Sequence, residues 1–194
     1  MTAAAHAPIA TGRSATGMST AKLAMWWLLA SEIVIFGGLL TVYIMRRIMF
    51  DHWAIYAEHT NVVAGSFNTF ALLTSSLFAV LAHRSAELKE HKRAFNYLWF
   101  AIASGLVFII VKSLEWSHEI ANGFTITANL FWSFYYTAAG LHGLHVIAGM
   151  IAMGIISMDV AKGKNLHRVE IAGIYWCFVE TVWIFLFPLL YIAK

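Results

Sequence analysis

Residues 130–157 read LFWSFYYTAAGLHGLHVIAGMIAMGIIS, a stretch without a single Asp, Glu, Lys or Arg. An α-helix rises ~1.5 Å per residue, so ~20 residues cross the ~30 Å hydrocarbon core of a bilayer. The stretch is therefore long enough to span a membrane as one continuous helix. A soluble domain has no comparable need for so long an uncharged run, which indicates that lipid is part of this protein's solvent.

The rest of the chain repeats this pattern. Of the 194 residues, 60% are hydrophobic and 12% are charged, whereas soluble proteins have ~25% charged residues. Mean hydropathy is +0.71. Further apolar runs lie at residues 23–45, 62–82, 97–111 and 171–192.

The run at 97–111 is short for a span, but Phe95, Leu114 and Trp116 lengthen it. We expect Arg93 and Lys112 beside it to snorkel, with their charged ends in water. In lipid a helix satisfies its own backbone polar groups. The sequence thus predicts an all-α integral membrane bundle of five transmembrane helices, residues 22–194, after a polar tail, residues 1–21.

Basic residues indicate how this bundle is oriented, because cytoplasmic connections are enriched in Lys and Arg. Nine of the 13 fall on the side of the N-terminus: Arg13, Lys22, Arg84, Lys89, Lys92, Arg93, Lys162, Lys164 and Arg168. The other four are Arg46, Arg47, Lys112 and Lys194. We therefore expect a cytoplasmic N-terminus and an extracytoplasmic C-terminus. The net charge of +3 then reflects orientation and anionic phospholipid head groups, not nucleic acid.

The chain offers poor ligands for a redox centre. Its single cysteine, Cys177, permits neither a disulfide nor a multi-cysteine cluster, and in apolar surroundings it is expected to be an inert packing residue. Of the nine histidines, only His142 and His145 lie in mid-span, three residues apart on one helix. Bis-histidine haem needs imidazoles on facing helices, and copper needs more ligands than these. We expect no cofactor, metal or catalytic centre in this chain.

Four polar residues lie where lipid should make them costly. Glu32 and Glu180 each fall about ten residues into a span, ~15 Å deep, and His142 and His145 lie at a similar depth. A charge there costs ~2.5–3.5 kcal/mol on insertion scales, so these groups should face protein and be paired or protonated. The sequence predicts one buried cluster, with a contact between Glu180 and one of the histidines.

Two roles are open for this cluster. Histidines three residues apart can simply provide hydrogen bonds between helices, whereas Glu32 can also store a proton.

The glycines of the fourth span, Gly140, Gly143 and Gly149, are expected to let a neighbouring helix approach closely. A transporter needs a polar pathway from both sides of the membrane, and a single mid-membrane layer does not provide one.

Several separated motifs resemble subunit III of haem-copper cytochrome c oxidases. They are FWSFYYTAAGLHGLHVIAG at 131–149 and HRVEIAGIYWCFVETVWIFLFPLLY at 167–191, together with WLLASEIVIFGGLLTVYI in the first span and SLEWSHEI before the fourth. They follow the order of that family over about residues 22–192. Five spans match its short bacterial form.

The resemblance implies an accessory subunit of the bacterial cytoplasmic membrane that has no haem or copper of its own. It would pack against the catalytic subunit I, which holds the haem and copper, and against other subunits of the complex. It would also hold phospholipid and support proton uptake. The family's intramembrane carboxylate matches Glu32, and its paired histidines match His142 and His145.

The chain departs from the family at one motif. Where the family usually has Tyr-Trp-His-Phe-Val-Asp, this chain has Tyr-Trp-Cys-Phe-Val-Glu at residues 175–180, with Cys177 for the histidine and Glu180 for the aspartate. Similar substitutions occur in subunit-III-like proteins of nitric oxide reductases. Such an accessory protein is the main alternative, and an independent proton-coupled transporter is a weaker one.

Overall fold

The computed structural model describes residues 17–50 and 53–192, and this part of the chain is helical, without strands. Its elements are α1 (Thr20–Met49), α2 (Trp53–Ala57), α3 (Val62–Glu87), α4 (His91–Ala121), α5 (Leu130–Ala161), α6 (His167–Phe187) and the π-helical turn η2 (Pro188–Ile192). Five helices are long and apolar enough to cross a membrane: α1, α3, α4, α5, and α6 continued by η2. The predicted all-α bundle of five transmembrane helices is confirmed.

Two details differ from the sequence-based boundaries. The third span, predicted at its shortest as 97–111, belongs to the 31-residue helix α4. The predicted tail, residues 1–21, falls largely outside the described residues, and α1 already begins at Thr20. The division into a tail and a membrane domain therefore stays a prediction.

Asparagine side chains fix where two of the long helices begin. The Asn61 side-chain oxygen accepts a hydrogen bond from the Ala64 N–H at 3.1 Å, and Asn129 accepts one from the Trp132 N–H at 3.0 Å. Each satisfies one of the backbone donors that a helix leaves unpaired in its first turn. The polar residues that bound the apolar runs are thus the N-caps of α3 and α5.

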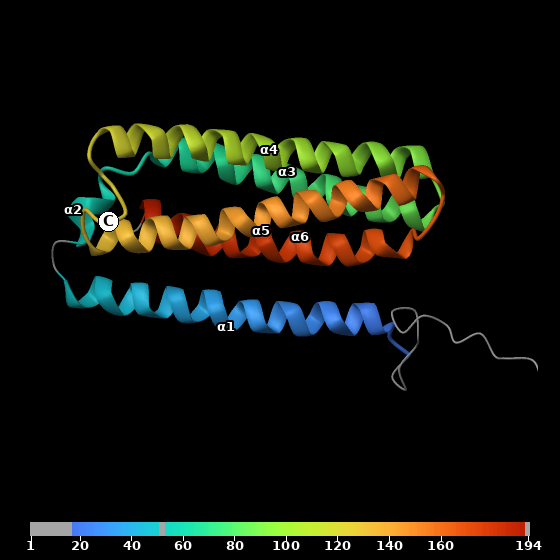
Figure 1. Cartoon of the computed structure of the whole chain (residues 1–194), viewed down its shortest axis with the longest axis horizontal. Coiled ribbons are helices and arrows are strands. Elements are labelled where there is room, and N and C mark those ends of the chain that lie inside the picture. Colours follow the sequence, from blue (N-terminus) through green and yellow to red (C-terminus); the bar gives the residue numbers. More distant parts are fainter. Residues whose placement is uncertain (1–16, 51–52, 193–194) are drawn as a thin grey trace, which may run out of the picture.

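Helices α3 to α6 form a tight bundle, whereas α1 lies apart from it (Figure 1). α3 packs most extensively on α4, and α6 packs on both α3 and α5. Of the residues of α1, only Leu29, Phe36 and Tyr43 are buried. They are spaced seven residues apart, so α1 touches the bundle along one narrow stripe.

The glycines of α5 differ in how close their neighbours lie. A Cβ atom added at Gly149 would come within 2.7 Å of the Trp176 indole on α6, closer than real side chains approach. At Gly140 and Gly143 an added Cβ would meet only ordinary contacts, at 3.5 and 4.0 Å. The close approach of α5 and α6 therefore depends on glycine at one position, Gly149.

The connections between helices gather at two ends of the bundle. The start of α1 lies at the same end as the α3–α4 and α5–α6 connections, while α2, the α4–α5 connection and η2 lie at the opposite end (Figure 1). We call the latter the α2 end. Most of the basic residues counted above lie at the end that holds the start of α1, so the fold keeps them on one side of the membrane.

We expect that side to be the cytoplasm, which surface labelling can test. Single cysteines replace Lys164 in the α5–α6 connection and Glu58 near α2, both exposed, in a Cys177→Ala background. A membrane-impermeant thiol reagent added to intact cells should label the Glu58→Cys variant and reach the Lys164→Cys variant only after lysis. Labelling of both from outside would contradict the predicted orientation.

Candidate functional site

Glu32, near the middle of α1, lies against His145 of α5. The carboxylate Oε2 and the imidazole Nε2 are 3.0 Å apart, an ion-pair distance, and both side chains are largely buried. The Phe36 ring covers the imidazole edge-on with its centroid at 5.3 Å. The Tyr175 hydroxyl donates to the His145 carbonyl at 3.3 Å, so α1, α5 and α6 meet here.

The second ring nitrogen of His145 decides what the pair can do. Nδ1 lies 2.8 Å from the Leu141 carbonyl oxygen, and a carbonyl can only accept, so Nδ1 must carry a hydrogen. Nε2 lies 3.0 Å from Glu32 Oε2, although this contact does not have hydrogen-bond geometry; because two facing lone pairs would repel each other, the contact is attractive only with a proton on one of the two atoms. With that proton the pair is neutral overall, whether it is imidazolium and carboxylate or imidazole and carboxylic acid.

The other two residues of the predicted mid-membrane cluster do not join this ion pair. His142 is fully buried, stacked on Trp183 at 5.2 Å and met edge-on by Phe108 at 5.5 Å. Neither of its ring nitrogens has a hydrogen-bond partner, and Glu180 Oε1 also has none. Within residues 17–50 and 53–192, no hydrogen bond or ion pair joins Glu180 to either histidine. The expected Glu180–histidine contact was therefore wrong, because His145 faces α1.

Among the described residues, no group of three or more His, Cys, Asp or Glu side chains could hold a metal ion. Cys177 is half-buried, and its sulfur lies 3.8 Å from the Ser76 hydroxyl of α3. That contact joins α3 to α6, which agrees with a packing role for the thiol.

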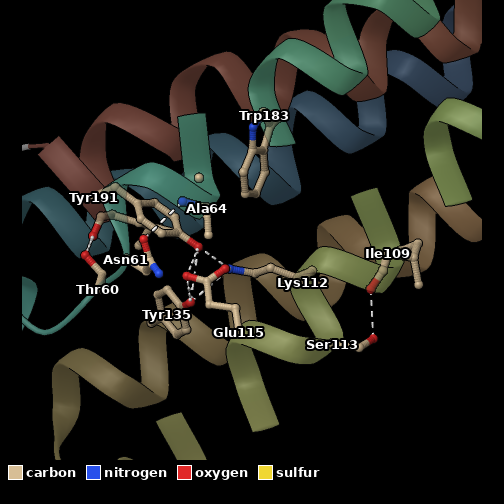
Figure 2. Close-up of polar contacts among 12 residues, drawn as sticks. Thr60, Asn61, Ala64, Ile109, Lys112, Ser113, Glu115, Tyr135, Trp183 and Tyr191 are labelled. Carbon is tan, nitrogen blue, oxygen red and sulfur yellow. Dashed lines mark hydrogen bonds and ion pairs between the residues drawn. The ribbon is translucent and has the colours of Figure 1, made fainter. Parts of the chain in front are cut away.

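A second polar cluster lies nearer the α2 end, and we call Lys112, Glu115, Tyr135 and Tyr191 the lysine network (Figure 2). The Lys112 ammonium donates to Glu115 Oε2 at 3.1 Å, to the Tyr135 hydroxyl at 2.9 Å and to the Tyr191 hydroxyl. Both tyrosine hydroxyls donate in turn to Glu115 Oε1, at 3.0 and 2.8 Å. The network joins α4, α5 and η2.

Both charged groups of the network, the Lys112 ammonium and the Glu115 carboxylate, have partners within it. Lys112 has three N–H donors, and its three contacts occupy all of them. Aromatic faces add to this, because the ammonium lies 4.5 Å from the Tyr135 ring centroid and 4.9 Å from that of Tyr191. One turn further along α4, Glu119 is also buried, and its Oε2 has no hydrogen-bond partner in the described part of the chain.

The sequence-based interpretation of Lys112 was wrong. A lysine beside the end of an apolar run was expected to snorkel to water, but Lys112 is 5% exposed. Glu115 and Glu119 also lie buried inside α4. The available signal was the spacing of Lys112 and Glu115, since residues three apart share a helix face and oppositely charged ones can pair inside it.

The chain is similar to known proteins over nearly its whole length. The family model of cytochrome c oxidase subunit III matches residues 11–194. The chain belongs to the cytochrome c oxidase subunit III family. It is an accessory subunit of a haem-copper oxidase and a multi-pass protein of the bacterial cytoplasmic membrane. Subunit III proteins carry no redox centre of their own.

Relatives of similar length agree with this family. The chain is 31% identical to the cytochrome c oxidase subunit 3 of Bacillus subtilis, covering 88% of this chain and 84% of that protein. It is also 31% identical to that of Thermostichus vulcanus, covering 84% and 83%. These matches favour an oxidase subunit over the nitric oxide reductase and transporter alternatives.

An archaeal relative is much longer. The haem-copper oxidase subunit I+III of Aeropyrum pernix is 30% identical over 184 residues, which are 89% of this chain but 22% of that protein. The present subunit III thus matches a minor part of a chain whose name combines both subunits.

The lysine network predicts how substitutions combine. Lys112→Met should destabilise the subunit by ~3–5 kcal/mol, because it leaves the Glu115 carboxylate buried without its counter-charge. The double variant Lys112→Met/Glu115→Gln removes both charges and should recover much of that loss. Thermal unfolding of the subunit within the purified oxidase measures both, with Lys92→Met on the exposed face of α4 as the control. Equal losses in the single and double variants would contradict the ion pair.

Proposed function

We propose that this subunit III supports proton uptake by the catalytic subunit I and stabilises it, with the Glu32–His145 pair as its proton-handling group. The observation that carries the proposal is the 3.0 Å approach of a mid-span carboxylate to an imidazole whose other nitrogen already holds a hydrogen. The pair needs one proton, and that proton can sit on either partner.

The electrostatics of the bilayer favour such a pair as a proton store. Moving the proton from Glu32 to His145 changes the positions of the charges but not the net charge of the pair, which stays zero. A net charge in mid-membrane is what the bilayer penalises. The pair therefore keeps a transferable proton at a depth where an isolated carboxylate would be costly.

The competing role for the same residues is structural. Glu32 lies on α1, which touches the bundle along a narrow stripe, so its attraction to His145 also holds α1 in place. In that case the pair acts as a polar contact between helices and moves no protons.

Substitution of Glu32 separates the two roles. Glu32→Gln keeps the size of the side chain but cannot release a proton, so turnover of the assembled oxidase should fall at high pH, where protons are scarce. Glu32→Ala removes the contact altogether and should weaken retention of the subunit. Two quantities are measured for each purified complex: its turnover as a function of pH, and its content of this subunit.

A buried acid outside the pair provides the matched control. Glu180 is 4% exposed, and its Oε1 has no hydrogen-bond partner among the described residues, so Glu180→Gln should leave the pH profile unchanged. If the fully assembled Glu32→Gln oxidase matched the parent at every pH, the proton role would be rejected and the structural role would remain.

We further propose that phospholipid fills the space between α1 and the bundle. A cavity of about 550 Å³ lies between α1, α3 and α6, lined by apolar side chains such as Trp26, Ile33 and Phe178. Its lining also includes Glu170, which pairs with Lys22 at 2.5 Å. Acyl chains suit the apolar walls, and a zwitterionic or anionic head group suits the charged pair.

Filling the cavity should displace that lipid. Ala30 lines it, so Ala30→Trp should lower the phospholipid that copurifies with the oxidase, as measured by mass spectrometry of the extracted complex. Ala24→Trp, on an exposed part of the same helix, is the matched control. Equal phospholipid in both variants would contradict a lipid at this place.

The partners implied by this proposal follow the family. Catalytic subunit I, which would hold the haem and copper, and other subunits of the respiratory complex would cover part of the apolar surface. On α1, for example, Trp27, Val34 and Ile48 are each more than 70% exposed. Membrane phospholipid would cover the remainder.

A further inference from the structure

The position of α1 depends on few contacts. Its buried stripe is only Leu29, Phe36 and Tyr43, and apolar cavities separate it from α6 on both sides of that stripe. Among the described residues, three polar contacts, which we call ties, connect it to the bundle. They are Lys22 to Glu170 at 2.5 Å, Glu32 to His145 at 3.0 Å, and the Tyr43 hydroxyl to the Leu189 carbonyl at 2.8 Å.

The third tie ends on η2, where helix geometry makes a carbonyl available. The last carbonyls of a helix have no intrahelical partner, and η2 ends at Ile192. The Leu189 carbonyl is satisfied by Tyr43 of α1. The Thr60 hydroxyl, which donates to the Ala57 carbonyl at 2.8 Å, also reaches the Leu190 carbonyl at 3.5 Å. The Tyr43 side chain thus caps this turn, and the Thr60 hydroxyl lies close to its next carbonyl.

On its other side, η2 is hydrogen-bonded to the lysine network. Tyr191 is fully buried, and its hydroxyl donates to Glu115 and accepts from Lys112 (Figure 2). Its ring packs so closely on α3 that a Cβ atom added at Gly65 would lie 3.1 Å away. One residue of η2 is therefore held by α3, α4 and α5 together.

These contacts make η2 the place where the α2 end of the molecule is joined. Leu189 reaches α1, Leu190 reaches the segment before α3, and Tyr191 reaches α3, α4 and α5. Both Leu190 and Tyr191 are at most 1% exposed. We propose that η2 is a clasp, which fixes the α2 end of α1 against the other four long helices.

Through the clasp, residues distant from Glu32 help to position the helix that carries it. The lysine network fixes Tyr191, Tyr191 fixes the turn, and the turn presents the Leu189 carbonyl to Tyr43. Since Glu32 is carried by α1 and His145 by α5, the clasp also limits how far that pair can separate. This inference concerns where α1 lies, and it holds whether or not Glu32 handles protons.

Distances between spin labels test the clasp in the assembled oxidase. In a Cys177→Ser background, labels at Ile48 and Val63 report the α2 end, and labels at Trp27 and Leu88 report the opposite end; all four side chains are more than 60% exposed. Tyr43→Phe and Tyr191→Phe each remove one hydroxyl. We expect both to broaden the Ile48–Val63 distribution towards longer distances and to leave the Trp27–Leu88 distribution unchanged.

Tyr56→Phe, at an exposed tyrosine of α2, is the matched control and should change neither distribution. A parental Ile48–Val63 distribution in the Tyr43→Phe oxidase would overturn the clasp, and so would equal broadening at both ends. If Tyr191→Phe prevents assembly, the Tyr43→Phe result decides alone. Because the readout is a distance and not turnover, it is independent of the pH profile that tests Glu32.

Discussion

The constraint behind this structure is the cost of a charge without a counter-charge inside a bilayer. Water cannot compensate such a group, so another part of the protein must. Lys112 shows the result, since its ammonium meets a carboxylate and two hydroxyls from three elements. Burial of apolar surface alone gives little driving force between helices in lipid, because lipid tails are as apolar as the side chains. Close packing, as at Gly149, and the few polar contacts therefore decide which helices meet.

The molecule consists of a closely packed four-helix bundle and one helix, α1, that has fewer contacts with it. Helices α3 to α6 bury wide faces against each other and enclose the lysine network, whereas α1 joins them through Glu32, Lys22 and Tyr43. An accessory subunit without a redox centre has no cofactor around which to fold. Its rigidity comes from its packed apolar core together with such internal polar contacts, and its remaining apolar surface is free to meet lipid or other subunits.

The sequence was sufficient for the five spans, because their apolar runs match the thickness of a bilayer, and it singled out Glu32 and His145 by their depth. It did not reveal the pairing of these residues, since Glu180 offered an equally deep carboxyl and only the arrangement of α1 and α6 around α5 distinguishes them. Lys112 was misread for a related reason. A lysine near the end of a span can reach either water or a buried acid, and the choice depends on Tyr135 and Tyr191, distant in sequence.

The spacing of Lys22, Glu32 and Tyr43 along α1 restricts which insertions and deletions this helix can accept. Lys22, Glu32 and Tyr43 are ten and eleven residues apart, and each residue turns a helix by about 100°. Inserting or deleting one residue between Glu32 and Tyr43 would rotate the tyrosine away from η2 while the other two ties stayed in place. We expect most of the exposed side chains of α1 to tolerate exchange for other apolar ones. Its length between the ties does not, so in this helix insertions and deletions should be far rarer than substitutions.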